Sequence, residues 1–135
     1  MASYRGFDKR GEMGRRGEQA AVEFFERRGD RVVERNYRTR EGELDLVVLS
    51  GRTLIFCEVK TLVARPEVRR GPAYPLEAIT PAKRRQVRLI ARSWLAKRLT
   101  AQQALRFRDI RFDAVGVVVA PSGKPLRLDR VESAF

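Results

Sequence analysis

The amino-acid sequence predicts a single α/β domain, and three observations support this prediction. The chain has 135 residues, which is the usual length of one domain and enough to bury a core. Apolar residues make up 43% of the chain and charged residues 34%, a globular rather than a disordered composition. Strand-forming segments accompany two segments in which apolar residues recur at helical spacing. We see no internal repeat and no second-domain boundary, so residues 1–135 are expected to form one domain.

The N-terminal region predicts a frayed start followed by a helix. Residues 1–13 are polar and basic, and we expect them to lie outside regular structure. A helix is predicted from Gly17 to Arg28, and Gly29 is expected to stop it. Its buried stripe consists of three apolar residues, Ala21, Val22 and Phe25. Glu18 lies on the same inward side, near the positive end of the helix. It is either a solvated residue favoured by the helix dipole or part of a site.

Five strands and a second helix are predicted in the rest of the chain. The first three strands span residues 31–38, 42–49 and 53–60, and the last two span residues 109–120 and 126–131. A long helix is predicted from Pro81, after the N-cap Thr80, to about Leu99. Its buried stripe contains Val87, Ile90, Ala91, Trp94 and Leu95. Residues 61–77 show no apolar period and contain three prolines, so we expect a mobile loop there.

The charge of the chain predicts a polyanionic partner. The formal net charge is +12, from 29 Lys and Arg against 17 Asp and Glu. Nucleic acid and an anionic membrane surface are the two candidates. No stretch approaches the roughly 18 apolar residues of a membrane span, and residues 1–10 lack the apolar segment of a secretory signal. We therefore expect a cytoplasmic protein with no membrane partner. The single Cys57 cannot form an internal disulfide, which suits a reducing compartment.

The absence of histidine excludes several kinds of catalytic site. Ser-His-Asp and Cys-His catalysis both require an imidazole, and the chain contains no histidine. A His-ligated zinc site is excluded for the same reason, and one cysteine cannot build a Cys-rich zinc site. Any chemistry must therefore come from carboxylates, lysine and a hard metal ion.

The second and third predicted strands form a hairpin that carries the candidate site. Gly51-Arg52 suits a two-residue type II′ turn. With this turn at the tip, the pairs expected on one face of the sheet are Leu49–Leu54, Val47–Phe56, Asp45–Glu58 and Glu43–Lys60. This face is apolar near the turn and ionic beyond it.

Two opposed carboxylates on this face predict a divalent cation. Directly opposed side chains lie roughly 4.5–5.5 Å apart at Cβ, so Asp45 and Glu58 would repel each other unless a positive charge lies between them. Mg²⁺ or Mn²⁺ takes oxygen ligands of this kind. Lys60 could then orient water or stabilise charge on a phosphate. The structural alternative is a pair of ordinary ion pairs, Lys60 with Glu43 and Asp45 with Arg38.

These residues resemble a known nuclease signature. Asp45, twelve intervening residues and Glu58-Val59-Lys60 are similar to the PD-(D/E)XK pattern. A wider set of motifs closely resembles the bacterial YraN-like family, which is described as uncharacterised and endonuclease-like. The motifs are Gly14-Arg15-Arg16-Gly17-Glu18, Arg35-Asn36-Tyr37-Arg38, Gly42-Glu43-Leu44-Asp45-Leu46, Glu58-Val59-Lys60-Thr61 and Arg111-Phe112-Asp113. The spacing of Glu18, Asp45, Glu58 and Lys60 is also similar to that of archaeal Holliday junction resolvases.

The resemblance implies a fold, a metal and a catalytic set. It implies a restriction-endonuclease-like fold with a mixed central sheet flanked by helices. It also implies Mg²⁺ or Mn²⁺ on Asp45 and Glu58, a catalytic Lys60, and Glu18 reaching the same site from the first helix. The chain departs from the pattern at Leu44, where the broader signature has proline. It also departs at Leu62, where the family commonly has arginine.

The expected activity is metal-dependent endonuclease cleavage of DNA, including branched or otherwise structured DNA. DNA is favoured over RNA, and a homodimer is considered because junction-cutting enzymes with this fold are commonly dimers. Basic residues in four regions are candidate nucleic-acid contacts. They are Arg38, the loop residues Arg65, Arg69 and Arg70, the helix-start residue Lys83, and the helix-row residues Arg84 and Arg88. The alternatives are a non-catalytic nucleic-acid-binding protein with the same fold and a small ribosome-associated basic protein.

Overall fold

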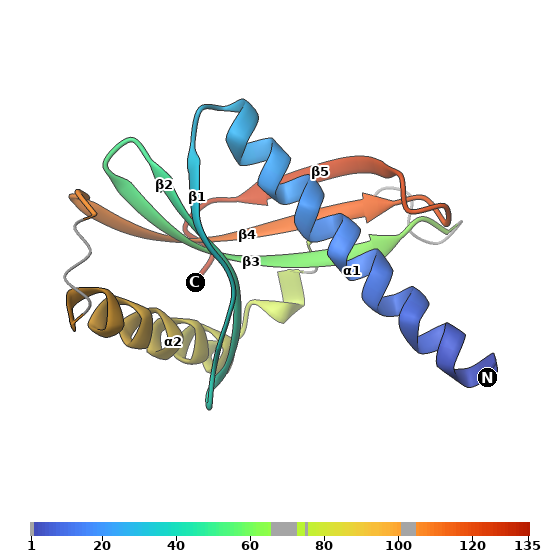
Figure 1. Ribbon diagram of the computed structural model, residues 1–135, viewed down its shortest axis with the longest axis horizontal. Coiled ribbons are helices and arrows are strands. Elements are labelled where there is room, and N and C mark those ends of the chain that lie inside the picture. The colour runs from blue at the N-terminus through green and yellow to red at the C-terminus, as the bar shows by residue number, and fades with distance from the viewer. Residues whose placement is uncertain (1, 66–72, 75, 101–104) are drawn as a thin grey trace.

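The computed structural model describes residues 2–65, 73–74, 76–100 and 105–135. Its elements in chain order are α1 (Ala2–Arg27), β1 (Arg31–Thr39), β2 (Gly42–Ser50), β3 (Thr53–Val63), the 3-10 helix η1 (Leu76–Ala78), α2 (Pro81–Thr100), β4 (Asp109–Val119) and β5 (Pro125–Val131). The five strands form one sheet in the order β1-β2-β3-β4-β5 (Figure 1). The central pair β3–β4 is parallel and the other three pairs are antiparallel, so the sheet is mixed.

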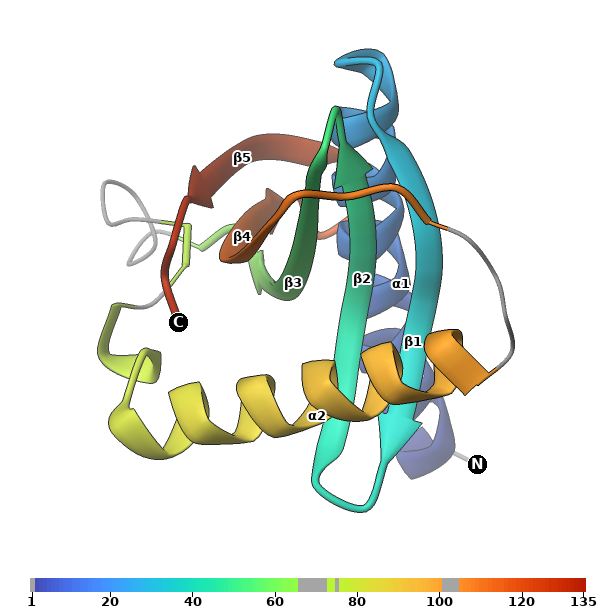
Figure 2. The ribbon, with the colours of Figure 1, turned by 90° about the vertical axis from the view of Figure 1, so that its left-hand side faces the viewer.

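The two long helices cover opposite faces of the sheet, as Figures 1 and 2 show. On the α1 side, Phe25 and its neighbours pack with Ile55 and Val117 from the middle of the sheet. On the α2 side, Trp94 packs edge to face with Phe56 at 5.7 Å between ring centroids. Strand side chains alternate between the two faces, so β2, β3 and β4 contribute to both cores. This arrangement confirms the predicted α/β, restriction-endonuclease-like class with a mixed sheet flanked by helices.

Helix α1 begins much earlier than the sequence predicted. It begins at Ala2 rather than Gly17, so the expectation that residues 1–13 lie outside regular structure is wrong for residues 2–13. Met13 is only 8% exposed and belongs to the core cluster on this face. Gly17 is not a starting point but a packing position. A Cβ at Gly17 would lie 1.8 Å from Oγ1 of Thr61, so only glycine lets the helix approach β3 this closely.

The predicted loop over residues 61–77 is only partly a loop. Residues 61–63 extend β3, and η1 begins at Leu76. Ala73 and Tyr74 are fully buried, and a Cβ at Gly116 of β4 would lie 2.1 Å from the carbonyl carbon of Ala73. The segment without regular structure is therefore shorter at both ends than the predicted loop. Residues 66–72, which include the candidate contacts Arg69 and Arg70, lie outside the described residues.

Two core residues and one buried ion pair complete the description of the fold. Cys57 and Trp94 are buried in the core. The buried Asp113 forms a bidentate pair with Arg111, with Nε and Nη2 each 2.9 Å from a carboxylate oxygen. Over the described part of the chain, neither long helix has an apolar stretch long enough to span a bilayer.

Candidate metal centre

The β2–β3 hairpin has the predicted register near its turn but not at the candidate site. The ladder runs from Ser50↔Thr53 to Leu46↔Cys57, as predicted. It ends there, so Asp45 and Glu58 are not paired and neither are Glu43 and Lys60. Instead, the Asp45 carboxylate accepts a hydrogen bond from the backbone N–H of Val59, with a distance of 2.7 Å to Oδ2. A side-chain oxygen thus replaces the carbonyl that a regular ladder would supply.

A change in the facing of β2 explains why the predicted pairs do not form. Leu46 and Val48 pack in the core beside α1, whereas Leu44 and Val47 both pack in the core beside α2. Strict alternation would place Leu44 with Leu46, so the strand rotates at Asp45. Glu43 and Asp45, which alternate with Leu44, therefore face the α1 side.

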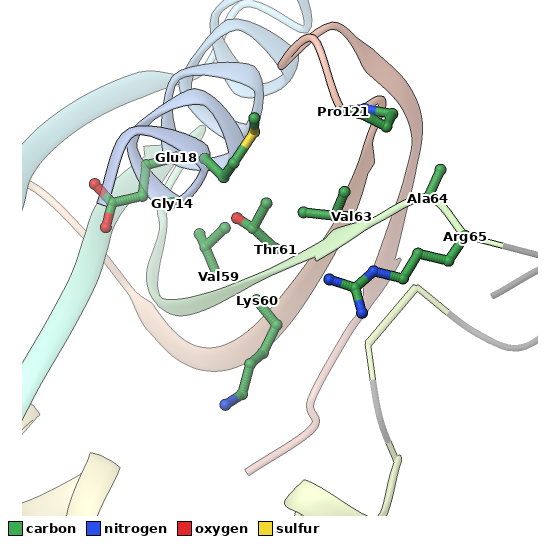
Figure 3. Close-up of a pocket in the computed structure, with 10 residues that line it drawn as sticks. Gly14, Glu18, Val59, Lys60, Thr61, Val63, Ala64, Arg65 and Pro121 are labelled. Carbon is green, nitrogen blue, oxygen red and sulfur yellow. The ribbon is translucent and has the colours of Figure 1, made fainter. Parts of the chain in front are cut away.

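Strand β3 keeps its regular alternation through the same region. Its parallel pairing with β4 is continuous from Thr53 to Val63. Glu58 and Lys60 consequently share the α2 side with Phe56. Figure 3 shows Val59 and Thr61 pointing from β3 towards α1 and Lys60 pointing away from α1. The prediction that Asp45, Glu58 and Lys60 share one face is therefore wrong.

Three carboxylates gather on the α1 side. One oxygen each from Glu18, Glu43 and Asp45 lies within 4.8 Å of the others. Glu18 comes from α1 and the other two from β2, and Glu43 is the exposed member. Glu18 therefore lies in one cluster with Asp45 and Glu43 rather than alone at the start of a helix. An all-oxygen set at this spacing suits a hard divalent cation such as Mg²⁺ or Mn²⁺.

The electrostatics of this carboxylate cluster disfavour three negative charges. Burial is the main cause that raises the pKa of Asp45, to about 7, and the nearby carboxylates of Glu18, Glu58 and Glu43 add to it. The hydrogen bond from Val59 acts in the opposite direction. Burial likewise raises the pKa of Glu18, against a hydrogen bond from Asn36 that lowers it. A bound cation would relieve both effects, because it favours the charged form of each ligand.

Asn36 holds two members of the cluster and was missed at the level of sequence. It has a positive φ of 53°, a conformation that asparagine tolerates better than most residues. Carboxylates only accept hydrogen bonds, so the Asn36 amide must turn its nitrogen towards them. In that orientation the nitrogen lies 3.1 Å from Oε1 of Glu18 and 2.8 Å from Oε1 of Glu43. Its place in the motif Arg35-Asn36-Tyr37-Arg38 was the only signal in the sequence.

Glu58 has partners from the protein itself. It is 8% exposed, forms an ion pair with Lys83 of α2, and accepts a hydrogen bond from the hydroxyl of Tyr74. Burial and this bond to Glu58 raise the pKa of Tyr74 above its ordinary value, so the phenol stays protonated and donates. Glu58 is still close enough for its charge to raise the pKa of Asp45. Tyr74 lies in a segment without periodicity, so no sequence signal indicated this contact.

The predicted nucleic-acid contacts have different surroundings in the structure. Arg38 pairs with Glu43, with 3.6 Å between Nε and Oε2, rather than with Asp45. Arg88 donates to the backbone carbonyl of Phe135 at 2.8 Å and lies over the ring of Phe112 at 4.7 Å. Lys83 is paired with Glu58, whereas Arg65 and Arg84 are exposed.

Comparison with known proteins shows relatives over nearly the whole chain. The model of a family described as "Uncharacterised protein family UPF0102" matches residues 17–117. A UPF0102 protein of Frankia casuarinae is 40% identical over 91% of this chain and 95% of its own length. A UPF0102 protein of Symbiobacterium thermophilum is 42% identical over 91% of this chain and 95% of its own length. Another, from Dictyoglomus turgidum, is 35% identical over 92% of this chain and 97% of its own length. These matches confirm the resemblance seen in the motifs, and the chain belongs to the UPF0102 family of YraN-like proteins.

Proposed function

We propose that this protein is a Mg²⁺- or Mn²⁺-dependent phosphodiesterase that cleaves DNA internally. The observation that carries the proposal is the cluster of Glu18, Glu43 and Asp45, whose oxygens lie within 4.8 Å of one another in a chain with a net charge of +12. A basic protein attracts a polyanion, but three adjacent carboxylates repel the phosphate. A divalent cation on the carboxylates removes this conflict, because it binds both the carboxylates and the phosphate oxygens.

Different residues of the site would have different roles in phosphodiester hydrolysis. Glu18, Glu43 and Asp45 would hold the cation, and Asn36 would keep two of these carboxylates in place. When bound, such a cation polarises a phosphate oxygen and lowers the pKa of a water molecule. Hydrolysis then adds water across one P–O ester bond. Lys60, catalytic by resemblance, lines the same groove as Glu18, but its side chain points away from α1. Its ammonium would have to turn towards the cluster to offset the negative charge that develops on the phosphate oxygens.

Metal binding and cleavage can be tested with one pair of variants. Asp45→Asn removes the innermost carboxylate of the cluster, and Asp109→Asn makes the same change at an exposed position at the start of β4. With Mn²⁺, the wild-type protein and Asp109→Asn should cut DNA from a panel of single-stranded, duplex, gapped and branched substrates. Asp45→Asn and EDTA should each abolish cleavage. Cleavage that survives Asp45→Asn would assign the activity to another site or to a contaminant.

A non-catalytic nucleic-acid-binding function is the second candidate, and one observation favours it. Glu58 is already paired with Lys83 and Tyr74. The protein's own groups therefore hold the oxygens that a catalytic carboxylate would offer to a metal. This candidate predicts DNA binding that falls steeply with salt and is unchanged by EDTA or by Asp45→Asn. Absence of Mn²⁺-dependent cleavage across the whole panel, together with such binding, would favour it over the nuclease.

A further inference from the structure

A groove lies between α1 and the end of β3, directly beside the carboxylate cluster. It has a volume of about 640 Å³, within the range of small-ligand sites. Glu18 lines one part of it and Arg65 another, with Val59 and Thr61 between them on β3 (Figure 3). The groove therefore connects a member of the proposed metal site to an exposed guanidinium.

The walls of this groove are partly apolar, and there is open space beside one glycine. Met13 of α1, Val59 and Val63 of β3, and Pro121 supply apolar surface. Gly14 also lines the groove, and a Cβ added there would meet no other atom within 4 Å. At Gly17, one turn further along the helix, Thr61 already occupies the space that a side chain would need. The open space beside Gly14 is therefore not shared with Gly17.

We propose that this groove holds one unpaired nucleotide of a DNA strand, next to the phosphate at the carboxylate cluster. The inference rests on the proposed function and names its substrate class: DNA with unpaired nucleotides, such as a single strand, a gap or a flap. The apolar walls suit the face of a base, and Arg65 suits the following phosphate. A base inside a continuous duplex could enter only after unpairing and unstacking, which costs a few kcal/mol.

A second groove gives the strand a path on the other side of Glu18. It is lined by Arg15, Arg16 and Arg35 and by the carboxylates of Glu12 and Glu18. Glu12 pairs with Arg16 at 3.2 Å, so three guanidinium groups outnumber two carboxylates on this side. A strand that crosses the carboxylate cluster would therefore meet basic residues both before and after the cluster. This charge pattern fits a chain of phosphates better than a single small anion or a neutral ligand.

The groove can be tested by filling it without harming the helix. Gly14→Leu places a side chain in the open space, whereas Gly11→Leu changes the same residue type on the same helix outside the groove. At Gly11 a Cβ would meet only the flexible end of Arg15, at 3.2 Å. Both substitutions improve helix propensity, so neither should lower the melting temperature. Arg65→Gln is a second variant that changes an exposed side chain and leaves the fold unaltered.

The measurement is binding of fluorescent single-stranded, gapped and continuous duplex DNA in buffer with EDTA, which needs no cleavage. Gly14→Leu should weaken binding of the unpaired substrates about tenfold, as expected for loss of one stacked base. Duplex binding should change less than about twofold. Gly11→Leu touches only the flexible end of Arg15, so it should not alter binding of unpaired DNA relative to duplex DNA. Arg65→Gln should weaken binding of unpaired DNA and reduce its salt slope by about one.

The outcomes separate this inference from the nuclease proposal. If Gly14→Leu binds unpaired DNA as the wild type does, or loses duplex binding equally, the groove does not select unpaired nucleotides and the inference is overturned. If single-stranded RNA binds more tightly than DNA with the same sensitivity to Gly14→Leu, the assignment to DNA is overturned. If the selective loss occurs while Mn²⁺ produces no cleavage in the wild type, the groove is supported and the nuclease proposal fails.

Discussion

Replacing Asp45 with asparagine should stabilise the metal-free protein at alkaline pH. Asp45 is partly buried, and its pKa is raised from 3.8 to about 7 by burial and by the nearby carboxylates. The amide of asparagine is isosteric, and its oxygen can still accept the hydrogen bond from Val59 N–H, which is 2.7 Å long in the structure. The substitution therefore removes the charge while keeping the shape and the main contact of the side chain.

The size and the pH window of the effect follow from the pKa of Asp45. Between pH 3.8 and about 7 the folded state holds a proton at Asp45 that the unfolded state has lost. The free energy of unfolding therefore falls as the pH rises through this window. Each pKa unit represents about 1.4 kcal/mol, so the full cost to the wild type above pH 7 is on the order of 4 kcal/mol. About 3 kcal/mol of it should develop between pH 5 and pH 8.

Urea denaturation in EDTA at pH 5 and at pH 8 measures this effect. The single tryptophan, Trp94, is 2% exposed and reports unfolding by fluorescence. The advantage of Asp45→Asn over the wild type should grow by about 3 kcal/mol from pH 5 to pH 8. Mn²⁺ at 100 times its Kd should remove most of this advantage at pH 8, because a ligand that binds only the folded state contributes about 2.7 kcal/mol to stability at that concentration.

The control is Asp109→Asn, which removes the same charge from an exposed position. Its stability relative to the wild type should change little between the two pH values. A difference between Asp45→Asn and the wild type that is the same at pH 5 and pH 8 would refute the electrostatic reasoning. Stabilisation of Asp45→Asn by Mn²⁺ to the wild-type extent would show that the cation binds elsewhere.

Three further sets of substitutions test the contacts around the site. Asn36→Gly should weaken Mn²⁺ binding in calorimetry with little loss of stability, because glycine accepts φ of 53° but offers no side-chain amide. Asn36→Ala should lower the free energy of unfolding by about 1 kcal/mol more than Asn36→Gly in urea denaturation, because alanine does not tolerate this φ. Lys83→Met leaves the buried Glu58 without its ion-pair partner, so the melting temperature in EDTA should fall and Mn²⁺ should restore part of it; an unchanged melting temperature would mean that this pair is weak. Gly17→Ala should destabilise the protein by more than about 1 kcal/mol despite its better helix propensity, and Thr61→Ala in the same chain should recover part of the loss in urea denaturation.

The elements of this fold could be predicted from the sequence because their signals are local. Apolar residues at helical spacing identified α2, and dense β-formers identified all five strands to within a few residues of their observed ends. The hairpin register near Gly51 followed from the turn, because a two-residue loop fixes which residues pair. The start of α1 could not be found this way. Gly17 has the sequence signal of a helix boundary, but its role is close packing against Thr61 on a distant strand.

The sequence pointed to Glu18 and Asp45, but it did not predict that Glu43, rather than Glu58, lies beside them. Asp45 and Glu58 were expected to face each other because the pairing rule was extended beyond Leu46 and Cys57, where the ladder ends. The rotation of β2 there depends on Leu44, which packs against the α2 side of the core. Strand periodicity does not show which of the two cores Leu44 will face when the strand rotates. Asn36 and Tyr74 depend on tertiary contacts in the same way.

The charge of Glu58 and the charges of the Glu18, Glu43 and Asp45 cluster are compensated in different ways. This difference predicts where the proposed cation would bind first. Glu58 pairs with the half-buried Lys83 and with the buried phenol of Tyr74, so its charge is compensated by the fold itself. Asp45 instead keeps a pKa of about 7, because burial and three carboxylates act on it together. A divalent cation gains most where negative charge is least compensated. It should therefore bind first at Glu18, Glu43 and Asp45. Glu58 could join only by giving up its pairing with Lys83, so the affinity of this position depends on how easily Lys83 is released.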